Sequence, residues 1–147
     1  MILLEKQCII LELEATGKEG VLTEMAEAIT TACPTIQAET IVEVLHEREQ
    51  HGSTGVGNGV AIPHGRIEGL DRTLLCFARS SRGIGFEAVD NRPVHLFVLL
   101  LSSEAKAAEY LPTLSRVSRL LKDSDIRNKL MQASSPKTIV QLFNRPE

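Results

Sequence analysis

One uninterrupted apolar segment, residues 94–101, limits most strongly how this chain can fold, because it reads Val-His-Leu-Phe-Val-Leu-Leu-Leu. A strand with one face in water alternates apolar and polar residues, and this segment does not. We therefore expect it to be the central strand of a sheet that is covered on both faces.

The rest of the chain alternates between short apolar runs and amphipathic stretches. Further strands are expected at residues 8–13, 60–62 and 73–78, and a loop at 83–93. Helices are expected at residues 20–33, 38–50, 111–121, 125–132 and 136–143. Pro112 is tolerable only if it lies in the first turn of its helix. No internal repeat or low-complexity linker interrupts this order, which indicates one layered α/β domain over residues 1–147.

The composition excludes several function classes. The 147 residues include 24% charged residues and carry a formal net charge of -3, so no broad basic field would attract nucleic acid or an anionic membrane. Glu5 and Lys6 interrupt the apolar N-terminus, so we expect neither a signal peptide nor membrane insertion, and hence a cytoplasmic protein. Cys8, Cys33 and Cys76 form no Cys-x-x-Cys pair, and we expect them to be reduced core residues.

The helix expected at residues 38–50 places an arginine on its buried side. Ile41 and Leu45 mark the apolar stripe, and Arg48 follows Ile41 by seven residues, which returns to the same face. We therefore expect Arg48 to point inward at the last turn. Taken alone, this position is equally consistent with a guanidinium that reaches solvent or pairs with a nearby glutamate.

Glycines at positions 52, 55, 57 and 59 crowd the segment between this helix and the strand at 60–62. Glycine allows positive φ and leaves backbone amides unshielded, which suits a loop that approaches a phosphate. A nucleotide-binding P-loop would continue with Gly-Lys-Ser/Thr into a helix, and a Rossmann motif would read Gly-x-Gly-x-x-Gly before a helix. Here the glycines lead into a strand, so nucleotide binding is disfavoured.

His64 follows this loop in the sequence Ile62-Pro63-His64-Gly65. Pro63 fixes its own φ and holds Ile62 extended, and Gly65 leaves room beside the imidazole ring. A neutral imidazole can attack phosphorus through one nitrogen when a carbonyl holds the N–H of the other. Phosphoryl transfer also needs donors for the developing charge, although a capped loop histidine without chemistry is the alternative. The candidate donors are Arg48, Ser53, Thr54 and the glycine-loop amides.

Residues 48–66 resemble the active-site signature of the fructose/mannitol-type enzyme IIA of the bacterial sugar phosphotransferase system. The segment includes Gly-Ser-Thr-Gly-Val-Gly-Asn-Gly and Ile-Pro-His-Gly-Arg, and it is most similar to the nitrogen-regulatory branch. Residues 85–94, Gly-Phe-Glu-Ala-Val-Asp-Asn-Arg-Pro-Val, resemble the next motif of that branch. The resemblance spans essentially the whole chain. It implies one enzyme IIA type-2 domain with a mixed, about five-stranded sheet flanked by helices on both faces.

In that family, the histidine of the Pro-His-Gly triplet is phosphorylated by the histidine phosphocarrier protein or its nitrogen-branch paralogue, without nucleotide, metal or other cofactor. The resemblance therefore gives His64 the role of nucleophile and places Arg48 near the phosphoryl group. It also implies a phosphocarrier with a phosphohistidine intermediate rather than a stand-alone enzyme. The residues expected to bind the phosphoryl group are Ser53, Thr54, Gly55, Gly57, Asn58, Gly65 and Tyr110.

Tyr110 is the main departure from the family pattern, because many fructose/mannitol-type members have a second active-site histidine there. A tyrosine can donate one hydrogen bond to a phosphoryl oxygen, but it is not a cation at neutral pH. Packing within the helix is an equally good explanation of this residue. A smaller departure is Arg66, which stands where lysine is common. The missing histidine favours regulation of target proteins over sugar delivery through a separate enzyme IIB.

Two other chemistries are disfavoured by spacing. His46 and His51 are five residues apart, about 140° around a helix, so they cannot bind one zinc ion as a His-Glu-x-x-His motif does. Ser53 and Ser115 lack the Gly-x-Ser-x-Gly elbow of a serine hydrolase. We expect His51 at the surface and His95 as a hydrogen-bonded structural residue.

Overall fold

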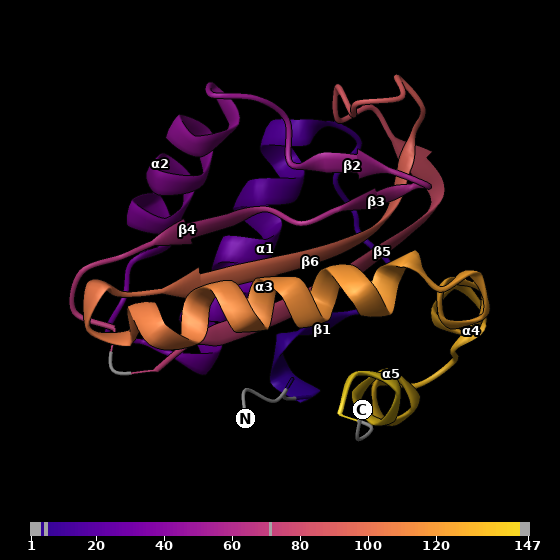
Figure 1. Cartoon of the computed structure of the whole chain (residues 1–147). Coiled ribbons are helices and arrows are strands. Elements are labelled where there is room, and N and C mark those ends of the chain that lie inside the picture. The colour runs from indigo at the N-terminus through magenta and orange to yellow at the C-terminus, as the bar shows by residue number, and fades with distance from the viewer. Residues whose placement is uncertain (1–3, 5, 71, 145–147) are drawn as a thin grey trace.

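The computed structural model describes residues 4, 6–70 and 72–144 (Figure 1). Much of the expectation about the chain's first residues rests on positions 1–3 and 5, which lie outside the described part. Within that part, the strands form one mixed, six-stranded sheet, against the expected five or so. The strands are β1 (Ile9–Ile10), β2 (Gly55–Gly57), β3 (Val60–Ala61), β4 (His64–Arg66), β5 (Leu74–Ile84) and β6 (Val94–Ser102).

The apolar segment at 94–101 is the central strand, as predicted. The sheet order is β1-β5-β6-β3-β2, and β4 also pairs with β6. β5 and β6 are antiparallel, whereas β3 and β4 run parallel to β6 one after the other. Every residue of β6 except His95 is buried, because both faces of the strand are covered.

Helices cover both faces of the sheet, which confirms the predicted fold class (Figure 1). α1 (Lys18–Ala32) and α2 (Ala38–Glu49) pack against each other, and α1 lies behind the sheet in this view. α3 (Ala107–Lys122) crosses the opposite face. The C-terminal helices α4 (Ser124–Gln132) and α5 (Pro136–Phe143) complete the chain close to the predicted bounds.

Several expected element boundaries are wrong. The strand expected at 8–13 is reduced to Ile9–Ile10. The side chain of Arg79 donates to the Leu11 carbonyl at 2.9 Å, so this carbonyl does not take part in the hydrogen bonding between strands. The helix expected at 111 begins at Ala107, after a short 3-10 turn, η2 (Glu104–Lys106), so Pro112 lies beyond the first turn. Ala108 and Pro112 are both exposed, so water can bind the carbonyl that the proline leaves unpaired.

The strand expected at 73–78 is longer than predicted. β5 continues to Ile84, with a register shift against β6 between Arg79 and Ile84, and it therefore takes in the start of the loop expected at 83–93. Gly83 has a φ of +84°, and a Cβ there would lie 2.8 Å from the His95 ring. The strand extension therefore depends on a glycine at that position.

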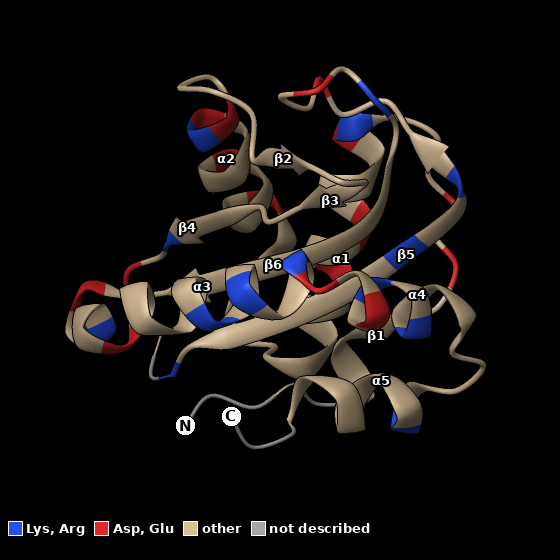
Figure 2. Ribbon diagram, turned by 45° about the vertical axis from the view of Figure 1, so that its right-hand side comes forward, with Lys and Arg blue, Asp and Glu red and all other residues tan. Residues whose placement is uncertain are grey.

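The central strand is free of charged residues, and two of the three cysteines are buried. Figure 2 shows charged residues on helices and loops and also within β5, which contains Arg79 and Arg82, while β3 and β6 carry none. Cys8 and Cys76 are buried, as expected, whereas Cys33 is only half-buried, and all three are free thiols. No helix in the described ranges has the length and apolar character needed to cross a membrane.

Candidate functional site

His64 is the first residue of β4, and its ring is half-buried. The Nδ1–H donates to the Ile62 carbonyl at 2.6 Å, the arrangement that the sequence predicted in general form. This bond fixes the tautomer, because it leaves Nε2 as the nitrogen with the free lone pair. Pro63 in turn accepts a hydrogen bond from the Leu100 amide at 2.9 Å, which ties the approach to His64 to the central strand.

The surroundings of His64 favour the neutral ring. Burial lowers the pKa of His64 below its ordinary value, the hydrogen bond to Ile62 opposes this, and the nearby charge of Arg48 adds to the lowering. A neutral imidazole has the lone pair that a nucleophile needs. The site therefore presents a neutral, oriented imidazole with Nε2 available.

Arg48 lies on the last turn of α2, half-buried, as the helix periodicity predicted. Its Nη1 donates to the Gly52 carbonyl at 2.9 Å, so the guanidinium is held by the glycine loop instead of a glutamate. The charge of Arg48 acts on both His64 and Tyr110. A cation with further N–H donors therefore stands at the histidine.

Glu49 supports the loop beside His64, and the sequence did not single it out. Its buried carboxylate pairs with Lys18 at 3.0 Å and accepts the Thr54 amide at 3.1 Å and the Thr54 hydroxyl. Thr54 in turn accepts the Ile62 amide at 2.9 Å, and Ile62 holds the ring of His64. The acidic residue beside Arg48 was a visible signal, but its partner Lys18 lies far away in the sequence.

Ser53, Thr54 and Gly55 lie in the loop beside this network, where their polar groups already have partners. The Ser53 hydroxyl donates to the Phe86 carbonyl at 3.1 Å and accepts the Gly55 amide at 3.0 Å. A Cβ at Gly55 would lie 2.7 Å from the Cβ of Ala88, so this glycine is needed for packing. In this state of the protein, these residues shape the loop.

Gly57 ends β2 and Asn58 begins the turn to β3, with φ values of +94° and +58°. Asn58 lines a cavity of about 180 Å³ together with Ser118 and Lys122 from the second half of α3. Val60, which follows the turn, and His64 pair with Leu96 and Leu100 of β6, so four residues of extended chain, about 13 Å, separate them. The structure therefore does not bring this turn together with His64.

Gly65 permits a close contact between α2 and β4. A Cβ at this position would lie 2.6 Å from Cγ1 of Val44, so the space expected beside the imidazole ring is instead filled by α2. The missing side chain lets the helix that carries Arg48 lie directly on the strand that carries His64. Gly65 thus contributes to the site through packing.

Tyr110 is buried on α3, as packing within the helix predicts, and its ring also lies near that of His64. The ring centroids of His64 and Tyr110 are 6.1 Å apart. On the other side, the guanidinium carbon of Arg66 lies 4.9 Å from the centre of the Tyr110 ring. Burial raises the pKa of Tyr110 above its ordinary value, which keeps the phenol protonated as a donor.

The remaining histidines lie outside this cluster. His51 is exposed and His95 Nδ1 bonds to the Ser80 carbonyl at 2.9 Å, as expected of each. His46 pairs with Glu19 at 3.0 Å. Within the described residues, no group of three or more His, Cys, Asp or Glu side chains is placed to hold a metal ion.

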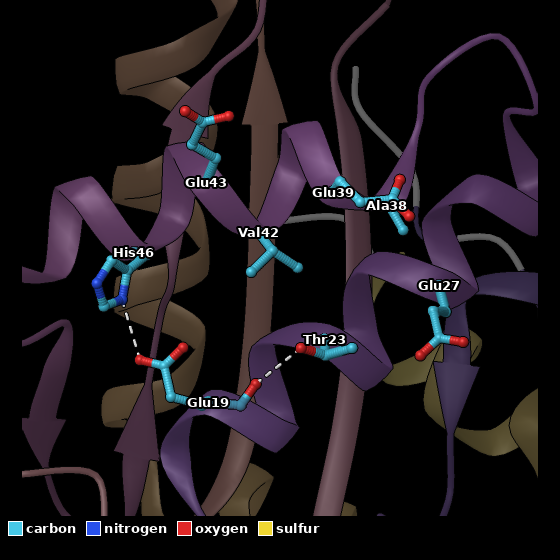
Figure 3. Close-up of a pocket in the computed structure, with 8 residues that line it drawn as sticks. All are labelled: Glu19, Thr23, Glu27, Ala38, Glu39, Val42, Glu43 and His46. Atoms are coloured by element: carbon cyan, nitrogen blue, oxygen red, sulfur yellow. Dashed lines mark hydrogen bonds and ion pairs between the residues drawn. The ribbon is translucent and has the colours of Figure 1, made fainter.

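One surface cavity lies apart from His64. It measures about 690 Å³ and lies in the groove between α1 and α2 (Figure 3). Its lining residues are Glu19, Thr23, Glu27, Ala38, Glu39, Val42, Glu43 and His46. The residues around His64 do not line it, so the chemistry described above does not use this groove.

Comparisons with known proteins show which family the chain is similar to. Residues 2–145 match the family model described as "Phosphoenolpyruvate-dependent sugar phosphotransferase system, EIIA 2". The nitrogen regulatory protein of Bradyrhizobium diazoefficiens is 38% identical over 144 residues, which cover 98% of this chain and 94% of that protein. The crystal structure of nitrogen regulatory protein IIA-Ntr from Neisseria meningitidis has a TM-score of 0.89, with 32% identity and 97% of each chain covered.

One relative is much longer than this chain. The fructose-specific EIIABC component of Bacillus subtilis is 34% identical over 143 residues, which cover 97% of this chain. The chain spans only about a fifth of that protein, since the match covers 22% of its length. The similarity therefore extends to both regulatory and sugar-specific proteins.

Proposed function

Because the chain belongs to the EIIA 2 family of the phosphoenolpyruvate-dependent sugar phosphotransferase system, we propose that it accepts a phosphoryl group on Nε2 of His64. The donor is a histidine phosphocarrier protein. The observation that carries this proposal is the hydrogen bond from Nδ1 to the Ile62 carbonyl, which orients the ring and leaves the Nε2 lone pair free.

The proposed step is an in-line transfer between two imidazoles. The lone pair of His64 Nε2 attacks phosphorus, the N–P bond of the donor phosphohistidine breaks, and its electron pair returns to the donor nitrogen. His64 keeps its Nδ1 proton, and the Ile62 carbonyl stabilises the positive charge that the ring gains. No other acid or base is required.

Charge on the moving phosphoryl group is stabilised by Arg48 in this proposal. Its guanidinium has five N–H donors, and the bond to Gly52 uses only part of this capacity. Tyr110, whose ring centre lies 6.1 Å from that of His64, adds a neutral donor. Ser53, Thr54, Gly55 and Gly65 contribute by shaping the site, and we leave Gly57 and Asn58 out of it.

We infer that the output is regulatory. A phosphoryl group on His64 adds about 1.5 to 2 negative charges at a half-buried surface site, enough to make or break a contact with a target protein. The high coverage of nitrogen regulatory relatives supports this output. The second candidate is transfer to a separate enzyme IIB of a fructose/mannitol-type permease, which the similarity to the fructose-specific component supports.

A phosphorylation assay tests the proposal. The chain, incubated with phosphoenolpyruvate, the upstream kinase and the phosphocarrier protein, should gain one phosphate that is labile in acid and stable in base. His64→Ala should abolish this label, and His51→Ala, which changes an exposed histidine, should leave it unchanged. Label that survives His64→Ala would contradict the proposal. Rapid transfer from the labelled chain to a purified enzyme IIB would favour the transport output.

A further inference from the structure

Arg66 and His64 lie on the same side of β4, because they are alternate residues of one strand. Gly65, between them, faces Val44 of α2. Tyr110 of α3 lies against both side chains, 6.1 Å from the His64 ring and 4.9 Å from the Arg66 guanidinium carbon. The guanidinium is therefore one aromatic ring away from the histidine.

Arg66 also forms a weak ion pair with Glu104. Its Nη1 lies 3.3 Å from the Glu104 carboxylate, in an ion pair whose side chains are 43% and 80% exposed. Exposed pairs of this kind contribute little, because water and salt screen them. A phosphoryl group offers more negative charge and three acceptor oxygens, to which a guanidinium can bind in bidentate fashion.

Glu104 begins a segment whose helix starts have no side-chain caps in the described part of the chain. Ser103 precedes η2, and its buried hydroxyl has no hydrogen-bond partner in the described part of the chain. Lys106 at the start of α3 also provides no side-chain cap that the structure describes. Pro112 removes one hydrogen bond of the early helix. Two further side-chain bonds hold this segment, from the Thr73 hydroxyl to the Glu109 carboxylate at 3.3 Å and from the Ser102 hydroxyl to the Lys106 carbonyl at 3.5 Å. Neither involves Glu104, whose contact is the ion pair with Arg66.

We propose that Arg66 transmits the phosphorylation state of His64 to the segment 103–111. In the unphosphorylated chain, Arg66 lies between the Tyr110 ring and Glu104. In the phosphorylated chain, its guanidinium turns to the phosphoryl oxygens and releases Glu104, so η2 and the start of α3 loosen. The surface that a target protein can distinguish between the two states is then this segment. The inference rests on the proposed phosphorylation of His64.

Amide hydrogen exchange of the segment 103–111, measured by mass spectrometry, tests the inference. Phosphorylation should raise the exchange rate of this segment at least about threefold in the wild type. In Arg66→Gln, the segment should exchange rapidly with and without the phosphoryl group. The difference in exchange rate between the two states should therefore disappear. Arg92→Gln is the matched control, since it removes the same charge from an exposed position between β5 and β6 and should keep the contrast.

Glu104→Gln separates the holding contact from the phosphoryl group. In the unphosphorylated protein, it should raise exchange in the segment to the level of the phosphorylated wild type, while labelling of His64 proceeds at the normal rate. Slow exchange in unphosphorylated Glu104→Gln, or a contrast retained in Arg66→Gln, would overturn the inference. If the wild type is phosphorylated on His64 but the exchange rate of the segment does not change, only the inference about Arg66 is overturned. If the wild type takes no label on His64, the proposed function is overturned as well.

Discussion

At the scale of single residues, the site consists of one oriented imidazole and the groups that fix its charge. The requirement for a carbonyl on one ring nitrogen followed from general imidazole chemistry, and Ile62 supplies it. The inward position of Arg48 followed from helix periodicity. The role of Gly65 did not, because its reason is contact with Val44 on a different element. The local sequence therefore indicated the chemistry available to His64 and Arg48, but it did not indicate which residue of another element contacts Gly65.

Replacement of Arg48 tests its proposed part in the transfer. Arg48→Ala should slow labelling of His64 about tenfold to a hundredfold, less than the loss of a fully buried donor, because the charged transition state loses a partner. The melting temperature should change little, since the side chain is half-exposed. Single-turnover labelling and thermal unfolding measure the two effects. Labelling as fast as in the control Arg92→Ala would leave Arg48 with a packing role only.

At the scale of elements, long-range contacts decided what the sequence pattern left open. Helix bounds in the regular stretches were predictable from apolar spacing, as α1 and α5 illustrate. The start of α3 was not, because the proline rule points to 111 while exposure of Pro112 lets the helix begin at Ala107. The Lys18 and Glu49 pair was likewise invisible, since it joins the start of α1 to the end of α2.

Loss of the Glu49 carboxylate should destabilise the junction of α1, α2 and the glycine loop. Glu49→Gln leaves Lys18 without its buried partner, and we expect a decrease of about 3 kcal/mol in the free energy of unfolding. Urea denaturation measures it. The exposed pair offers a matched control, because Glu104→Gln should cost less than about 1 kcal/mol. Equal losses in the two variants would contradict the structural role of Glu49.

At the scale of the whole molecule, the fold class was predictable because a single apolar strand required cover on both faces. The strand order was not, since parallel pairing of both β3 and β4 with β6 leaves no mark in the local sequence. Membership of the family accounts for the common architecture. Within this architecture, the contact of Tyr110 with His64 and Arg66 joins α3 to β4.

The lowered pKa of His64 predicts how stability depends on pH. The unfolded chain binds a proton at about pH 6.5, whereas the folded chain does so only at a lower pH. The free energy of unfolding is therefore unaffected by this group above that range and falls as the pH drops from about 6.5 to the folded pKa. Denaturation across this window should show a smaller decrease for His64→Gln than for the wild type. Parallel curves would contradict the lowered pKa.

The most direct test of the account is the position of the phosphoryl group on the ring. Nuclear magnetic resonance of the phosphorylated chain, labelled with ¹⁵N at histidine, reports coupling between phosphorus and the nitrogen that carries it. The structure predicts coupling to Nε2 of His64, with Nδ1 still protonated on the Ile62 carbonyl. Coupling to Nδ1, or to any histidine other than His64, would contradict it.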